Sequence, residues 1–412
     1  MLIRTLIFQA FLEVRISSKG IPMARASKIT RNVLWTIHRW IGVGLVVLLV
    51  PVAVSGGLLV FQDEFDAVLN PARYATTGSA VMQPTVYLAS ASKALGGAQA
   101  SSVRFPEDAG APIIVQARTA PAEGRPAKVL NVYLDPPTAN VLDVVDFRAS
   151  LFGFLHVFHE NLTVPEYSGR AIVGWTGVGM LVLSLTGIWL WWPRNGVFIP
   201  GLRWRRAPTT SNNLHHLAGF WISLPLAFVS LTGIYLAFPP QARSLMSSVA
   251  PMTPQGARGF AAPMRQTALT ADSALNVALK AEPGARVAAI FLPVAARGDA
   301  AAGAAPNWRL QLRPRDGNVL TVLVNDQNGA ITRPPAPLAG DRAAQWVRWL
   351  HEGSHSGVIW KIIVFATGIL PAIFGITGVM MWLRGRRNRK ILRNRTIKQH
   401  ATGASGKLQA AE

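Results

Sequence analysis

Seven of the eight histidines stand at the ends of long apolar stretches, and they are the first residues to suggest chemistry. Two of them, His38 and His215, open the first and the third stretch. His216 follows His215 directly at the start of the third stretch. His156 and His159 precede the second stretch, and His351 and His355 precede the fourth. Ionisable side chains near a membrane are costly there and usually mark a pathway or a bound cofactor. The pattern therefore predicts two facing histidine pairs, one on each side of a membrane.

Facing imidazoles favour a haem over a zinc or copper ion. Zinc and copper sites usually recruit three or four ligands, often with carboxylates or Cys among them. The chain has no Cys, and no acidic residue lies near His38 or His215 in the sequence. Two neutral imidazoles from opposing helices suit the two axial positions of a haem iron, whose flat apolar ring fits between helices lined by small residues.

We therefore expect two b-type haems (haem b) per chain. The preferred axial ligands are His38 with His215 near the cytoplasmic side, and His156 with His351 near the outer side, where a Leu-His pair recurs. Three further histidines stay open as alternatives or neighbours: His159, His355 and His216. His216 follows His215 directly, so it points about 100° round the helix. Arg39, beside His38, is a candidate partner for the inner haem propionates, although a lone interfacial Arg more often anchors a lipid phosphate.

The elements that must position these histidines are four uncharged stretches, residues 40–61, 171–192, 217–239 and 362–383. At 1.5 Å per residue, a helix of about 22 residues reaches roughly 33 Å and crosses a hydrocarbon core of about 30 Å. Only 15% of the chain is charged, against about 25% in ordinary soluble domains. These features exclude a soluble enzyme.

The net charge of +21 is concentrated in short segments. Residues 1–40, 193–213 and 384–412 together carry +18, whereas the long connections 62–167 and 239–357 together carry +1. The positive-inside rule then places both termini and the 193–213 loop in the cytoplasm, and the long connections outside. A charge distributed in this way argues against binding to nucleic acid.

The chain reads as two parallel copies of one unit. Ile37-His38-Arg39-Trp40-Ile41-Gly42 matches Leu214-His215-His216-Leu217-Ala218-Gly219, and Ser184-Leu185-Thr186-Gly187-Ile188 matches Ser230-Leu231-Thr232-Gly233-Ile234. The fourth stretch carries Ile376-Thr377-Gly378-Val379. Such Thr-Gly pairs let membrane helices approach closely, and the Thr hydroxyl can bond back to its own helix. Close approach beside a flat cofactor is the alternative reading.

Each outer connection is expected to form a small α+β domain. In the first, residues 85–95 predict a helix, residues 112–118, 128–134 and 141–145 predict strands, and residues 135–138 a turn. In the second, residues 271–281 predict the helix, 308–313 and 320–324 the strands, 325–329 the turn and 296–306 a loop. Asp135 and Asp326 stand in the two turns, where Asp usually caps the local backbone.

The predicted fold class is a membrane α-helical protein, with four transmembrane helices in two parallel repeats and two small α+β external domains. In order, the segments are a cytoplasmic N-terminus 1–32, a span 33–61, an external domain 62–147, an interfacial helix with a span 148–192, a cytoplasmic loop 193–212, a span 213–239, an external domain 240–340, an interfacial helix with a span 341–383 and a basic cytoplasmic tail 384–412. Residues 1–22 do not resemble a secretory signal, and Met23 is an alternative start.

The histidine and Thr-Gly motifs together resemble those of the PepSY-associated transmembrane family, the iron-regulated membrane proteins that include ferric-siderophore reductases. The features that carry this resemblance are Ile37–Gly42, Asn213-Leu214-His215, the two Leu-His pairs, residues 186–193 and Val132-Tyr133-Leu134-Asp135. The resemblance spans about residues 30–390, and it departs from the family at His216, where the family usually has Arg. It implies a bacterial inner-membrane protein with two periplasmic PepSY-like domains, some of whose relatives bind two haems and reduce ferric siderophores.

Two functions from different classes follow. The first is di-haem electron transfer from a cytoplasmic or quinol donor to a ferric siderophore or another periplasmic acceptor, since the chain has no GxGxxG nucleotide motif. The second is a non-enzymatic membrane module whose external domains bind or regulate a protease or transporter. A transporter is the third and weakest reading, because the spans carry no charged residue within their cores.

Overall fold

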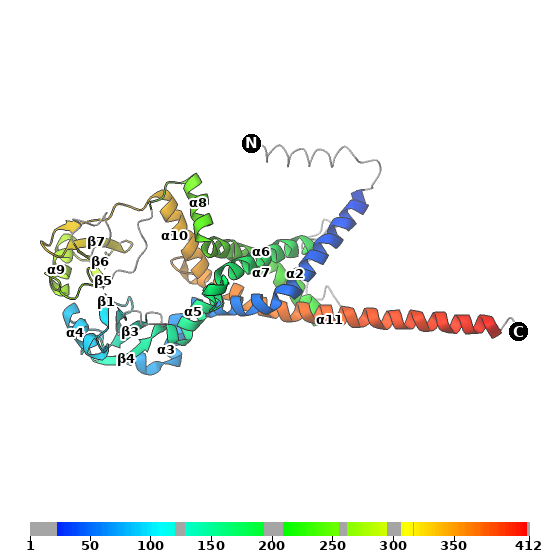
Figure 1. The fold of residues 1–412 in the computed structure, drawn as a ribbon, viewed down its shortest axis with the longest axis horizontal. Helices are drawn as coiled ribbons and strands as arrows, with labels where there is room; N and C mark the ends of the chain where they lie inside the picture. Colours follow the sequence, from blue (N-terminus) through cyan, green and yellow to red (C-terminus); the bar gives the residue numbers. More distant parts are fainter. Residues whose placement is uncertain are drawn as a thin grey trace. The chain divides into compact units, whose positions relative to one another are not determined.

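The structure is a computed structural model (Figure 1), and it describes residues 23–119, 128–192, 209–254, 262–294, 306–315 and 317–409. The expected N-terminal segment 1–22, most of the expected loop 193–212 and nearly all of the expected loop 296–306 lie outside these residues. The chain divides into two compact units, which are described separately. The helical unit comprises Met1–Gly57, Arg170–Phe238 and Leu350–Glu412, and the sheet unit comprises Leu58–Gly169 and Pro239–Trp349.

Four long helices build the helical unit: α2 (Met23–Val60), α6 (Gly169–Trp191), α7 (Thr210–Ala237) and α11 (Gly357–Gln409). They contain the four uncharged stretches, and all four are long and apolar enough to cross a membrane. Their most apolar windows are only 17% to 33% buried inside the protein. An apolar helix surface that the protein leaves uncovered is suited to contact with lipid. The expectation of four helices long and apolar enough to cross a membrane is confirmed in the part of the chain that the structure describes.

Small residues bring these helices close together. A methyl group added at Gly368 of α11 would lie 2.4 Å from the Cα atom of Gly57 in α2. One added at Gly179 of α6 would lie 2.1 Å from a side-chain carbon of Leu45 in α2. Leu49, Met180 and Leu226 then form a buried contact among α2, α6 and α7. Close approach through glycine is a common way of packing helices in lipid.

The sheet unit is built on eight antiparallel strands in the order β4-β3-β2-β1-β5-β6-β7-β8. The strands are β1 (Gln99–Arg104), β2 (Ile113–Arg118), β3 (Val129–Leu134), β4 (Val141–Asp146), β5 (Arg286–Phe291), β6 (Asn307–Arg313), β7 (Leu320–Asn325) and β8 (Ile331–Thr332). The pairing of β1 with β5, with Val103 opposite Ile290, joins the strands of the first half to those of the second. The two expected α+β segments therefore share one continuous sheet.

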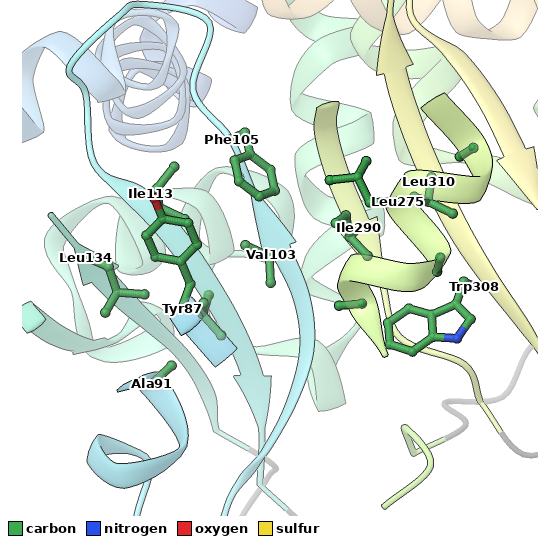
Figure 2. Packing of buried hydrophobic residues seen from close by; sticks show 14 of the residues in the cluster. Tyr87, Ala91, Val103, Phe105, Ile113, Leu134, Leu275, Ile290, Trp308 and Leu310 are labelled. Atoms are coloured by element: carbon green, nitrogen blue, oxygen red, sulfur yellow. The ribbon is translucent and has the colours of Figure 1, made fainter. Parts of the chain in front are cut away.

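One helix from each half covers this sheet. Helix α4 (Pro84–Ala94) contacts β1 to β4, and α9 (Ala271–Ala281) contacts β5 to β7. Figure 2 shows Tyr87, Val103, Ile290 and Trp308 within the buried cluster that the two helices close over the strands. The bounds of α9 coincide with the predicted helix, and the predicted strands match β2, β3, β4, β6 and β7 within two residues. Strands β1, β5 and β8 were not predicted.

The two turn aspartates bind the segments that precede the covering helices. Asp135 accepts hydrogen bonds from the backbone N–H and the hydroxyl of Thr77, 2.7 Å each, and from the Thr138 hydroxyl. Asp326 accepts them from the N–H groups of Ala268 and Leu269 and from Nε1 of Trp308 at 2.8 Å. Burial raises the pKa of Asp135, but these bonds outweigh it and hold the pKa below its usual value. Both aspartates therefore bind backbone N–H groups of segments far away in the sequence, whereas the sequence suggested that they cap the local backbone of their own turns.

Shorter helices complete the sheet unit: α3 (Gln62–Leu69), η1 (Pro71–Tyr74), η2 (Phe147–Ala149), α5 (Leu151–Asn161), η3 (Pro165–Tyr167), α8 (Pro239–Val249) and α10 (Ala339–Glu352), whose end from Leu350 belongs to the helical unit.

The contact between Gly57 and Gly368 gives a test of the helical packing. A methyl group in Gly368→Ala would meet the Gly57 backbone and lie 2.8 Å from the Ala53 carbonyl oxygen, so the two helices must separate. We expect a loss of about 1–3 kcal/mol in the free energy of unfolding. Gly44→Ala is the matched control, because no atom lies within 4 Å of the added methyl group. Denaturant titration of the full chain in detergent, followed by circular dichroism, measures both; equal stability of the two variants would contradict this packing.

Candidate histidine site

His38 of α2 and His215 of α7 lie close together in the helical unit, with one ring edge-on to the other. Their ring centroids are 6.4 Å apart, and the ring planes stand at 87° to each other. Both rings are half-buried, and the edge of Phe374 from α11 packs against His215 with 5.7 Å between the ring centroids. The structure therefore brings together the two histidines that open the first and third spans.

This separation fits two imidazoles bound on opposite sides of one metal ion. With a metal–nitrogen bond of about 2.0 Å and about 1.1 Å from ring nitrogen to ring centroid, two such centroids lie about 6.2 Å apart. The observed separation of 6.4 Å is close to that value. In the part of the chain that the structure describes, no group of three or more His, Asp or Glu side chains lies close enough to hold a metal ion. The site thus offers a pair of imidazole donors on opposing helices.

A threonine hydroxyl contacts each ring at Nδ1. Nδ1 of His38 lies 2.9 Å from Oγ1 of Thr186 in α6, and Nδ1 of His215 lies 3.1 Å from Oγ1 of Thr377 in α11. Each hydroxyl also donates to the carbonyl one turn earlier in its own helix, to Val182 at 2.6 Å and to Ile373 at 2.8 Å. The Thr-Gly pairs thus bond back to their own helices as expected and contact the histidines as well.

His351 repeats this arrangement at the end of α10. Its Nδ1 lies 3.2 Å from Oγ1 of Thr232 and 3.1 Å from the carbonyl oxygen of Val229, both in α7. The neighbouring glycine leaves room for the ring, because a methyl group at Gly233 would lie 2.9 Å from Cε1 of His351, which would then have to shift. At Gly187 and Gly378, the corresponding methyl groups would lie 3.5 Å from His38 and 3.6 Å from His215, which is ordinary contact.

The other predicted site residues occupy different surroundings. His216 is exposed, and its ring stands at 87° to that of His215, with 6.5 Å between the ring centroids. His156 is exposed and His159 half-buried on α5 of the sheet unit. His355 is exposed between α10 and α11, in the left-handed region with φ of 57°.

Arg39 packs between two indole rings rather than against a histidine. Its guanidinium carbon lies 4.3 Å from the ring centroid of Trp35 and 5.3 Å from that of Trp40. Cation–π contacts of this kind hold the guanidinium at the start of the span. Arg39 is therefore held one residue from His38.

The hydroxyl partners of the histidines were not predicted from the sequence. In the sequence, Thr186, Thr232 and Thr377 belong to a repeated tract of small residues. Such a tract mainly indicates close packing of helices. The Thr-Gly pair alone could not have identified them, because Thr176-Gly177 and Thr367-Gly368 are also Thr-Gly pairs, and their hydroxyls bond back to their own helices.

Comparison with known families places residues 35–385 in the PepSY-associated TM region. No curated protein matches the chain. The matched segment includes all the histidines discussed here, the Thr-Gly pairs that contact three of them and the strands of the sheet unit. With most of the chain matched and four apolar helices long enough to cross a bilayer, this chain is a membrane protein and belongs to the family of the PepSY-associated TM region.

Proposed function

We propose that this chain is a di-haem electron-transfer protein of a bacterial inner membrane. It would take electrons from a cytoplasmic or quinol donor and deliver them to the periplasmic side, for the reduction of ferric siderophore iron. The observation that carries the proposal is the pair of imidazoles on α2 and α7, 6.4 Å apart, with their Nδ1 atoms turned to threonines. The predicted pair of haem ligands His38 and His215 thus has the separation that two axial ligands require.

Haem between two histidines cycles between Fe(III) and Fe(II) and so accepts and gives one electron at a time. The chain's own contribution is to supply the donors and to surround them with apolar helices. Met180, Leu226 and their neighbours form an apolar contact between these helices. Arg39, held by Trp35 and Trp40, supplies a cation near His38 for a propionate.

The outer haem is proposed to take His351 as one ligand and His156 as the other. His351 is supported by its contacts with Thr232 and Val229, which match the contact of the inner histidines with Thr186 and Thr377. The choice of His156 rests on the recurring Leu-His pair in the sequence, and His159, half-buried three residues later, is its alternative.

The duplication and the topology are part of the proposal. Matching contacts support two parallel repeats: Asp135 and Asp326 bind the segments before α4 and α9.

The basic segments would lie in the cytoplasm and the sheet unit in the periplasm as PepSY-like domains. In the periplasm, the sheet unit could meet a ferric siderophore. Reduction would then release the iron, because the hard oxygen ligands of a siderophore hold Fe(II) far less well than Fe(III).

The inner site predicts a clear difference between neighbouring histidines. Detergent-purified protein should carry two b-type haems per chain, with a Soret band that shifts on reduction by dithionite. His215→Ala should lower the haem content by about half, because one axial ligand is lost. His216→Ala is the matched control and should keep both haems, since that ring is exposed. Protein that binds no haem when haem is supplied would favour the non-enzymatic module instead.

The outer site has its own control. Gly233→Ala should displace His351, because the methyl group would lie 2.9 Å from its ring, and should remove the outer haem as His351→Ala does. Gly378→Ala should keep both haems, since its methyl group would lie 3.6 Å from His215. Haem quantification per chain measures both variants. Loss of haem in His156→Ala but not in His159→Ala would select His156, and the reverse would select His159.

Reduction of siderophore iron can be distinguished from mere binding of the siderophore to the protein. Mixing dithionite-free reduced protein with a ferric siderophore should reoxidise the haems and release Fe(II), which a ferrous chelator traps. The same siderophore loaded with Ga(III), which has no accessible reduced state, should leave the haems reduced. Haems that stay reduced with the ferric form as well would exclude a siderophore of that type as the acceptor.

A further inference from the structure

The hydrogen bonds around His38, His215 and His351 determine where each imidazole carries its proton. A threonine hydroxyl has a single proton, and Thr186 gives it to the Val182 carbonyl while Thr377 gives it to the Ile373 carbonyl. Toward the histidine, each hydroxyl can therefore only accept. Thr232 is in the same state, since its hydroxyl donates to the Val229 carbonyl at 2.9 Å.

A carbonyl oxygen strengthens this assignment for His351. The Val229 carbonyl lies 3.1 Å from Nδ1 of His351 and stands three residues before Thr232, which contacts the same ring. Because a carbonyl has no proton to give, Nδ1 must be the donor, and the lone pair then resides on Nε2.

We infer that Thr186, Thr377 and Thr232 are positioning residues that hold His38, His215 and His351 in the Nδ1–H tautomer and lower the reduction potential of the haem that each would bind. This inference rests on the proposed function for its redox part only. An N–H donated to an oxygen makes the opposite ring nitrogen a stronger electron donor, and a stronger donor favours Fe(III) over Fe(II).

The redox part predicts the effect of removing a single hydroxyl. Thr186→Val and Thr377→Val keep the shape of the side chain but lose the acceptor, so the midpoint potential of the inner haem should shift upward. Thr377→Ser restores the hydroxyl and should return the potential to the value of the wild type. Thr232→Val should shift the potential of the outer haem and leave the inner one unchanged.

The helices themselves provide matched controls. Thr176 of α6 donates to the Ile172 carbonyl at 2.9 Å, and Thr367 of α11 donates to the Val364 carbonyl at 2.7 Å. Both are buried and bond back to their own helix like the positioning residues. Thr176→Val and Thr367→Val should therefore leave both potentials unchanged. Equal shifts in control and test variants would show a general packing effect and overturn the redox part of the inference.

The tautomer can be read without any haem. In haem-free full-length protein with ¹⁵N-labelled histidine, NMR should find Nδ1 protonated and Nε2 unprotonated in three histidines, identified by their loss in His38→Ala, His215→Ala and His351→Ala. An Nε2–H tautomer at these positions would overturn the inference. If the protein binds no haem, the proposed function fails, and this measurement still decides the assignment of the protons.

Discussion

A hydrogen bond between a histidine ring nitrogen and a threonine hydroxyl is the interaction on which the helical unit depends. It recurs three times, from α2 to α6, from α7 to α11, and from the end of α10 to α7. In an apolar surrounding an unpaired imidazole N–H would be costly, so each ring is held where its acceptor lies. The bond thus fixes which nitrogen of each ring, Nε2, is left for a ligand.

Glycine makes this geometry possible. The residue after each threonine is Gly187, Gly233 or Gly378, so that the ring can lie against the helix that holds its acceptor. The same device joins α2 to α11 at Gly57 and Gly368. Helices in lipid gain little from apolar contact with each other, and small residues allow the close packing that stabilises them instead. Packing and ligand placement therefore depend on the same short motif.

The elements that local patterns specify were predictable from the sequence. The helix 271–281, the turn at Asp326 and the four apolar spans are each determined by residues close to one another along the chain. Strands β1 and β5 were missed, because β1 contains Ser101 and Ser102 in place of a regular apolar alternation and because the two strands pair across the halves of the chain. Such a pairing depends on contacts between distant segments.

The histidines were predicted as candidates, but their partners were not. Their positions at span ends identified them, whereas Thr186 lies 148 residues from His38, and Thr377 lies 162 residues from His215. A threonine in a membrane helix usually serves its own backbone, as Thr176 and Thr367 do. Only the packing of specific helices turns three such residues toward an imidazole.

The most direct test of the account is electron paramagnetic resonance of the oxidised, haem-loaded protein. The rings of His38 and His215 stand at 87°, and near-perpendicular imidazoles give low-spin Fe(III) a larger maximum g value than parallel ones. The account predicts such a signal in the wild type and its loss in both His38→Ala and His215→Ala. A high-spin signal in the wild type, or a low-spin signal that neither substitution changes, would contradict ligation by this pair.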